Sequence, residues 1–324
     1  MNAEQWVAVL ATAITTATPL VFACLGETLT ERGGVINLSA EGTLLMGAMT
    51  GFAVAQRTQN LWLGFLAAAG VGVLFAAIVA WGSLTLKQSQ VAIGFVLALL
   101  GGDLSSFLGN AYVLTPGPTV PSWPLPLLSG IPVVGRIFFR GDVLVYLSYV
   151  LTLGMWLLFY HSGAGLWIRM LGEQPAAAFA RGIPVIRWRY ALTLMGGALM
   201  GVAGAAFSLD FKAGWTHRHT AGYGWLALAI VIFGGWDPLR VVGGVYVFGI
   251  LQSLASVAQS QVRGIPTQVF SVAPFVLMIG VLVLTSEDVM ELCLKPLPKS
   301  WHAFVRNRLG VRPPAALGQP FEQQ

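Results

Sequence analysis

Asp103 is a candidate functional residue, because it is an acid in the middle of a long apolar stretch. An ionisable side chain inside a membrane is costly and usually marks a solute or ion pathway. Phe107 and Asn110 follow at the i+4 and i+7 positions, so one helix face carries an anion, an aromatic ring and an amide. We expect this face to line a pathway for a polar solute that contains a ring. The alternative is a structural polar cluster, in which Asp103 caps a broken helix or pairs with a base.

A second acid, Glu41, lies near the start of another apolar stretch, just after Asn37 and Ser39. These three residues and the adjacent Gly42 are further candidates for contact with a solute. Ser39 is also a favourable N-cap residue, and Glu41 would then lie in the first helical turn, where the helix dipole favours an acid. Asn37 could equally cap or break the helix. The sequence leaves both explanations open.

Residues that could form a catalytic or metal site are few and scattered. His161, His217, His219 and His302 have no partners at the spacings of a zinc site. The phosphate-binding pattern GxxxxGK[ST] does not occur, so we do not expect the chain to bind ATP through such a loop. We expect no enzyme activity and no bound cofactor or metal, and we expect a solvated loop around His217 and His219.

The composition requires a membrane protein. The 324 residues are 56% hydrophobic and only 10% charged, and their mean hydropathy is +0.74. Soluble domains carry about 25% charged residues, so a soluble enzyme, a nucleic-acid-binding protein and a disordered chain are excluded. The apolar runs are continuous rather than alternating, so we predict an all-α polytopic bundle of about nine (eight to ten) crossings and not a β-barrel. The predicted crossings are 6–25, 38–56, 61–85, 90–110, 142–160, 188–209, 222–235, 239–258 and 267–285.

Lys and Arg residues are concentrated on one side of the predicted bundle. The positive-inside rule then places the 161–187 loop and the C-terminal tail in the cytoplasm. The 111–141 loop lies outside and is too rich in proline to form one regular helix. We divide the chain into a membrane domain, 1–286, and a cytoplasmic tail, 287–324, which we expect to be mostly flexible.

Glycine is frequent, with 39 residues in the chain. Several glycines have small-xxx-small spacing, including Gly47 with Gly51 and Gly197 with Gly201. In lipid this spacing lets helix backbones approach closely. We therefore predict close helix contacts at these positions.

The segment 165–187 is too polar to span a membrane and has its own helical pattern. Gly172, Glu173 and Gln174 precede a run of alanines, and the pattern ends at Gly182, a typical helix stop. We predict one short amphipathic helix that lies along the inner face of the membrane. Such a helix is suited to docking a cytoplasmic partner.

The segment 165–187 resembles the coupling loop of ABC-importer permeases. The stretch GETLTERGGVINLSAEGTLLMGA (26–48) is similar to the signature near the N-terminus of permeases that import nucleosides and simple sugars. GYGWLALAIVIFGGWDPLRVVGGVYVFGILQ (222–252) is similar to their paired late helices around a Gly-Trp-x-Pro turn, and GIPTQVFSVAPFVLMIGVLVL (264–284) to their last helix. The similarity in order and spacing runs from about residue 6 to 286 and is greatest to the purine-nucleoside branch.

The resemblance implies a permease of a type II-like ABC importer in a bacterial inner membrane. Its implied partners are ATP-binding cassette subunits that use ATP and Mg, a second homologous permease, and a periplasmic or lipoprotein substrate-binding protein; no nucleic acid is implied. The resemblance assigns coupling to the ATP-binding subunit to Gly172, Glu173, Ala177, Arg181 and Gly182, and the pathway to Asn37, Ser39, Glu41 and Gly42.

Other functions stay open. The same fold could import a simple sugar, a branched-chain amino acid or riboflavin. A stand-alone secondary transporter would need coupling-ion ligands on broken helices, and the sequence offers no carboxylate partner for Asp103. An integral membrane enzyme would need a catalytic constellation, which the sequence does not contain.

Overall fold

The computed structural model describes residues 2–220, 222–261 and 313–321, together with isolated residues between 269 and 283. The elements of this part are helices, and its strand-like pairs are two isolated bridges. Six helices in it are long and apolar enough to cross a membrane, which confirms the predicted polytopic helical fold. They are α1 (Ala3–Arg32), α3 (Leu61–Ala80), α4 (Gln90–Gly109), α6 (Val143–His161), α9 (Val185–Ala206) and α11 (Pro238–Gln261).

Two further predicted crossings, 38–56 and 222–235, also hold helices. These are α2 (Ala40–Thr58) and the short α10 (Tyr223–Phe233). The predicted crossing 267–285 lies outside the continuously described residues. The count of about nine therefore stays a prediction.

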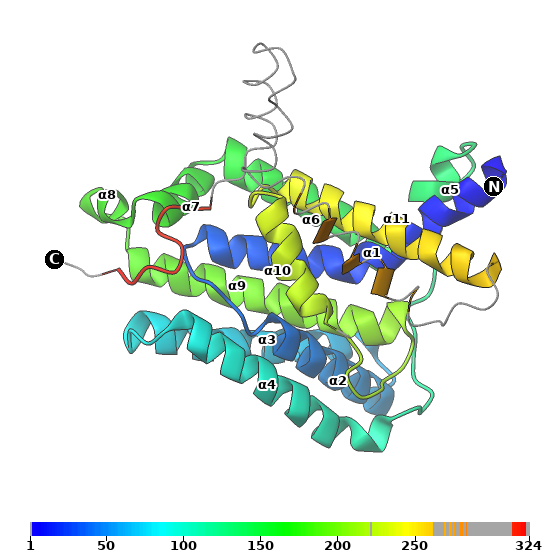
Figure 1. Cartoon of the computed structure of the whole chain (residues 1–324), viewed down its shortest axis with the longest axis horizontal. Helices are drawn as coiled ribbons and strands as arrows, with labels where there is room; N and C mark the ends of the chain where they lie inside the picture. The colour runs from blue at the N-terminus through cyan, green and yellow to red at the C-terminus, as the bar shows by residue number, and fades with distance from the viewer. Residues whose placement is uncertain are drawn as a thin grey trace, which may run out of the picture.

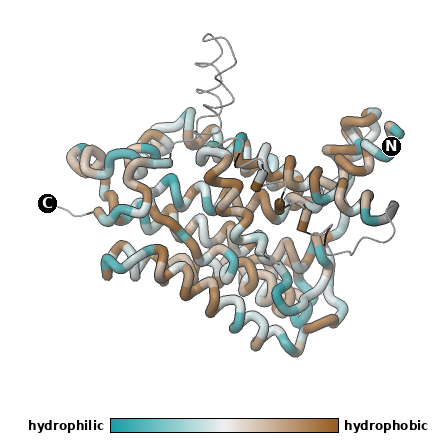
Figure 2. The backbone as a smooth tube through the Cα atoms, viewed as in Figure 1, coloured by the Kyte–Doolittle hydropathy of each residue, from teal (hydrophilic) through white to brown (hydrophobic). Residues whose placement is uncertain are grey.

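Helices α1 and α9 run side by side through the middle of the molecule (Figure 1). Helices α2, α3 and α4 pack on one side of this pair, and α6 and α11 on the other, while α10 crosses in front. Hydrophobic residues follow the lengths of the helices, and hydrophilic ones gather toward both ends (Figure 2). One end holds α7 (Gly163–Glu173) and α8 (Pro175–Ala180), and the opposite end holds the short α5 (Val134–Phe138).

Helix α1 continues well beyond the predicted apolar stretch, through the polar residues up to Arg32. Residues 26–31 are buried and Arg32 is half-buried, and the threonine hydroxyls find acceptors within the helix. Thr28 donates to the Cys24 carbonyl at 2.7 Å and Thr30 to the Gly26 carbonyl at 3.1 Å. A threonine hydroxyl that donates to its own helix needs no water as a partner. Helix α1 therefore continues to Arg32, whereas the hydropathy pattern predicts its end near residue 25.

Close backbone contacts join α2, α3 and α9, as the glycine spacing predicts. A Cβ placed on Gly47 would lie 2.7 Å from the Gly201 carbonyl oxygen, and one on Gly72 would lie 2.0 Å from the Gly197 carbonyl oxygen. Only glycine permits such approach, and the short distance increases van der Waals contact between helices in lipid. These contacts fix α9 as the central helix.

The proline-rich 111–141 loop lies over the α5 end of the bundle and forms no long helix, as predicted. It is tied to the end of α9 and the chain that follows it. The Val120 amide donates to the Leu209 carbonyl at 2.9 Å, and the Leu114 amide to the Trp215 carbonyl at 3.1 Å. The loop is therefore an ordered cover.

The predicted single helix near 172–182 is wrong in one respect. The chain forms two helices, α7 and α8, with a break at Gln174, where Pro175 starts α8. A proline is accepted at the first turn of a helix but not in its interior. Gly182 follows α8 with φ +80°, in the left-handed region that favours glycine, so the predicted stop is confirmed.

Residues 313–321 are the described part of the predicted tail, and they pack against the bundle. They lie across the α7 end, where the Ala316 amide donates to the Gly172 carbonyl at 2.8 Å. The Gly318 amide donates to the Gly34 carbonyl at 3.1 Å. The small residues and prolines of this segment let its backbone lie close to the helices.

The contact between α3 and α9 gives a direct test. We expect Gly72→Ala to lower the free energy of unfolding by about 1–3 kcal/mol, because the new methyl would overlap the α9 backbone. The control is Gly70→Ala on the same helix, where nothing lies within 4 Å, and where alanine should gain up to about 1 kcal/mol in helix propensity. Thermal unfolding of both purified variants in detergent measures this. Equal melting temperatures would contradict the packing.

Candidate functional site

Glu41 joins two helices that both begin inside the bundle. Its carboxylate accepts hydrogen bonds from the Thr220 hydroxyl at 2.6 Å, the Gly222 amide at 3.0 Å and the Gly224 amide at 2.7 Å. These donors surround the start of α10, where helix amides have no partners of their own and the dipole is positive. Glu41 therefore caps α10, although it lies in the first turn of α2.

Helix α10 has 11 residues, which gives a length of about 16 Å at 1.5 Å per residue. A complete crossing needs about 30 Å. The described residues just before it, 212–220 and 222, are non-helical. In the same way, the non-helical residues 35–39 precede α2. Two helices that each follow a non-helical segment thus begin beside Glu41.

The residues before α2 form a buried polar network. The Ser39 hydroxyl donates to the Asn37 side-chain oxygen at 2.6 Å and lies 3.2 Å from the Thr43 hydroxyl. All three side chains are buried. The predicted side-chain cap from Ser39 to α2 is wrong, because its hydroxyl bonds to Asn37 and makes no cap hydrogen bond. Asn37 stabilises the non-helical segment, as one of the two sequence hypotheses expects.

Gly42 lies where α2 crosses α4. A Cβ at this position would lie 2.5 Å from the Leu97 carbonyl oxygen. Glycine at this position therefore permits close contact between α2 and α4. Helix packing accounts for the glycine, and no contact with a ligand is needed to account for it.

Asp103, Phe107 and Asn110 are all exposed, and Phe107 is 79% exposed. Asp103 and Phe107 lie on the outer side of α4 and Asn110 directly follows this helix, whereas Gly101 faces α2. No hydrogen bond among the described residues joins Asp103 to Glu41. The structure therefore separates the predicted pathway residues into a buried group around Glu41 and an exposed group on α4.

His219 is 4% exposed, so the expectation of a solvated loop is wrong for this residue. Its ring lies 3.1 Å from the Thr216 hydroxyl and 3.3 Å from the Phe207 carbonyl oxygen. Burial, and then the nearby Lys212 ammonium, lower the pKa of His219 to about 4. The ring is therefore neutral at physiological pH, and Lys212 donates to the His219 carbonyl at 2.6 Å.

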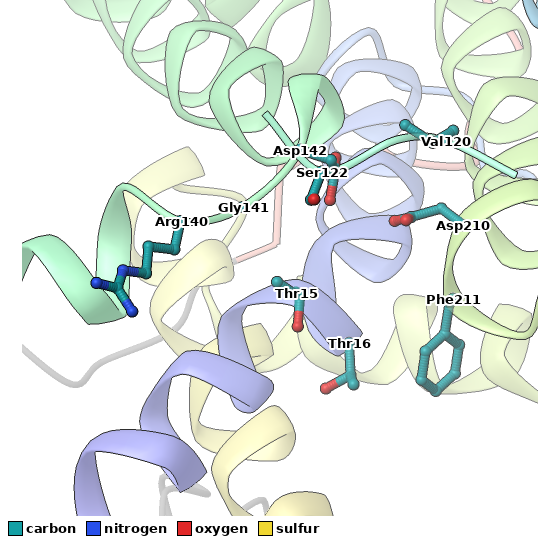
Figure 3. A pocket seen from close by; sticks show the side chains of 9 residues that line it. All are labelled: Thr15, Thr16, Val120, Ser122, Arg140, Gly141, Asp142, Asp210 and Phe211. Carbon is teal, nitrogen blue, oxygen red and sulfur yellow. The ribbon is translucent and has the colours of Figure 1, made fainter. Parts of the chain in front are cut away.

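A polar cavity of about 230 Å³ opens beside α1 at the α5 end (Figure 3). The Asp142 and Asp210 carboxylates turn toward the same space, while Arg140 points away from it. Asp142 also caps α6 through the Leu144 and Val145 amides at 2.7 and 3.1 Å. The sequence analysis missed this cavity because the acids lie at the ends of two distant helices. The lining residues are Thr15, Thr16, Val120, Ser122, Arg140, Gly141, Asp142, Asp210 and Phe211.

This lining is rich in hydrogen-bond acceptors and hydroxyls, so it suits a solute that carries hydroxyl groups or positive charge. Within the described residues, no group of three or more His, Cys, Asp or Glu side chains could hold a metal ion.

The turn between α10 and α11 is fastened to α1. The Trp236 indole donates to the Glu31 carboxylate, and the Arg32 side chain donates to the Trp236 carbonyl at 3.0 Å. This is the Gly-Trp-x-Pro turn noted in the sequence. Helix α10 is therefore held by α2 at its start and by α1 at its end.

The residues predicted for coupling gather on α7, α8 and the turn after them. Glu173, Arg181 and Gly182 are exposed, and Ala177 is half-buried. Gly172 is buried, and a Cβ there would lie 2.5 Å from the Arg32 carbonyl oxygen. Gly172 thus serves packing, whereas the exposed residues are free to meet another protein.

Comparison with known proteins identifies relatives over most of the chain. The profile of the family described as the branched-chain amino acid transport system / permease component matches residues 9–282. A putative glucose ABC transporter permease protein of Haloferax volcanii is 40% identical over 248 residues, 75% of each chain.

Two relatives are named for nucleosides. A nucleoside ABC transporter permease protein of Lactococcus lactis is 33% identical over 83% of this chain and 89% of its own length. A guanosine ABC transporter permease protein of Bacillus subtilis is 31% identical over 81% of this chain and 87% of its own length. No solved structure matches.

The cap on α10 gives the second prediction. Glu41→Gln should lower the free energy of unfolding by about 1–3 kcal/mol, because the amide NH₂ would face amide donors and a charge-assisted bond would be lost. The control is Glu4→Gln on the exposed first turn of α1. Melting temperatures in detergent compare the two, and an unchanged Glu41→Gln protein would show that the cap contributes little.

Proposed function

The chain belongs to the permease family of the branched-chain amino acid transport systems, and on this premise we propose that it carries nucleosides or related ring-containing solutes through an ATP-driven importer. It is a multi-pass subunit of the cell inner membrane. The proposed solute moves by alternating access. ATP and Mg are used by a separate subunit.

The observation that carries this proposal is the meeting at Glu41 of two helix starts, one of them the start of the short α10. Interrupted helices near the middle of a bundle expose helix ends and unwound backbone, which are the groups that transporters use to bind solutes. Here Glu41 satisfies the start of α10. We propose that the pathway runs beside this junction, with Asn37, Ser39 and Gly42 shaping it.

The relatives favour a solute that contains a sugar ring. Two are named for nucleosides or guanosine and one for glucose. A ribose and a glucose both present adjacent hydroxyls, which carboxylates bind well. The cavity with Asp142 and Asp210 and the face with Asp103 and Phe107 offer carboxylates and an aromatic ring. A simple sugar is therefore the second candidate, and a branched-chain amino acid or riboflavin has less support.

The α7 end would face the cytoplasm and receive an ATP-binding subunit on Glu173, Ala177, Arg181 and Gly182. Nucleotide can drive transport only through contacts that differ between the two states of the pathway. A substrate-binding protein would dock at the opposite end. A stand-alone secondary transporter has less support, because it leaves the exposed α7–α8 pair without a role.

A second permease would cover the outer side of α4. This helix carries several large exposed apolar side chains, and Phe95 on it lies against Trp225 of α10 with ring centroids 6.3 Å apart. Covering this face would turn Asp103, Phe107 and Asn110 toward an interface between subunits. The exposed apolar residues of α4 are Val91, Phe95, Val96, Leu99, Leu100, Phe107 and Leu108.

Purification of the chain from its native membrane in mild detergent tests the function. We expect an ATP-binding subunit and a second permease to come with it. In liposomes, ATP hydrolysis by this complex should rise when a binding protein loaded with nucleoside is added, and less with glucose. A chain that purifies alone and transports alone would contradict the proposal.

The docking assignment predicts the effect of a charge reversal. Arg181→Glu should reduce solute uptake about tenfold or more, since a like charge or lost pair at a protein interface costs several kcal/mol, while the chain still inserts. Arg181→Lys, which keeps the positive charge at this exposed position, is the control. Normal uptake by the Arg181→Glu variant would remove this residue from the interface.

A further inference from the structure

The ordered tail segment 313–321, which we call the C-terminal strap, contacts the proposed docking helices directly. Its Ala316 amide donates to the Gly172 carbonyl at 2.8 Å, and its Ala315 amide to the Glu173 carboxylate at 3.3 Å. The rings of Phe321 and Phe179 of α8 lie 5.8 Å apart. The strap therefore contacts the end of α7 and the end of α8.

The same strap contacts the start of the non-helical segment that leads to α2 and Glu41. The Gly318 amide donates to the Gly34 carbonyl at 3.1 Å. A Cβ on Gly318 would lie 2.8 Å from the end of the Ile36 side chain, and Gly318 has φ +75°, so this position requires glycine. Asn37 is the next residue of this segment.

Arg189, near the start of α9, binds the strap through a hydrogen bond to its backbone. It is 0% exposed. One terminal nitrogen donates to the Gln319 carbonyl of the strap at 3.0 Å, and the other to the Leu171 carbonyl of α7 at 3.4 Å. A Cβ on Gly34 would lie 2.7 Å from the guanidinium. One buried cation thus holds three segments together through backbone groups.

Burying the Arg189 guanidinium costs free energy, because the charged group loses its hydration. Its Nε has no hydrogen-bond partner, and no carboxylate among the described residues pairs with it. Among the described residues, the hydrogen-bond acceptors of this charge are backbone carbonyls. A neutral side chain of similar length could fill the same space without the cost of burying a charge. The geometry therefore favours a role in positioning.

We propose that Arg189 and the C-terminal strap are positioning elements that connect the proposed docking helices to the non-helical segment that leads to α2 and Glu41. A displacement of α7 and α8 by an ATP-binding subunit would pass through Gly172 and the strap to Gly34 and Ile36. It would then reach the Asn37 segment and α2. The strap also forms part of the surface next to Glu173 that such a subunit meets. This inference rests on the proposed function.

The test measures solute moved per ATP hydrolysed, using the whole complex in liposomes. Deletion of residues 313–324 should lower this ratio about fivefold or more, within the usual range of coupling between sites. ATP hydrolysis itself should continue. Deletion of residues 322–324 is the matched control and should leave the ratio unchanged.

Arg189 variants separate positioning from stability. Arg189→Met removes both donors to the Gln319 and Leu171 carbonyls and should lower the ratio, while Arg189→Lys keeps the charge and one donor and should restore part of it. Quantities of assembled complex and melting temperatures are measured for each variant, and the ratio is taken only per assembled complex.

Two results would overturn the proposal. A ratio that stays at the wild-type value while the amount of complex falls would show that the strap only stabilises the fold. Unchanged values throughout would show no role at all. Failure of the proposed function gives a different result: the wild-type chain would then purify without an ATP-binding subunit. In that case this inference would fail together with the proposed function.

Discussion

The fold depends on one requirement of the bilayer: a helix that begins inside it must bring partners for its free amides. Water is absent there, and each unsatisfied group costs several kcal/mol. Glu41 meets this requirement for α10 by accepting three hydrogen bonds at its start. The carboxylate thereby fixes the start of α10 and the residues just before it to the first turn of α2.

Close helix contacts provide the frame in which this junction can exist. Glycines on α2, α3 and α9 let three backbones meet, so α9 becomes a fixed centre. The α10–α11 turn is then tied to α1 by Trp236. The bundle combines rigid helix packing with a short helix that is fastened at both ends, and this combination suits a permease that changes state as connected units.

Much of the fold could be predicted because apolar stretches locate helices and proline and glycine locate breaks. The hydrogen-bond partners of Glu41 could not be predicted, since Thr220 and Gly224 are distant in sequence and contact it only after folding. Ser39 carried a genuine cap signal, but Asn37 competes for its hydroxyl. The strap has no apolar periodicity, so only its contacts reveal its order. Asp142 and Asp210 were missed for the same reason as the Glu41 junction: the facing residues are distant in sequence.

The Glu41 junction also constrains how the chain is made. Thr220 follows Glu41 by 179 residues, and ribosomes add about 5–20 residues per second, so the carboxylate waits roughly ten to forty seconds for its donors. During this interval α2 cannot be released into lipid with a bare charge at its start. Glu41 must stay hydrated at the insertion machinery, and the order of synthesis therefore makes the arrival of α10 the step that completes the insertion of α2.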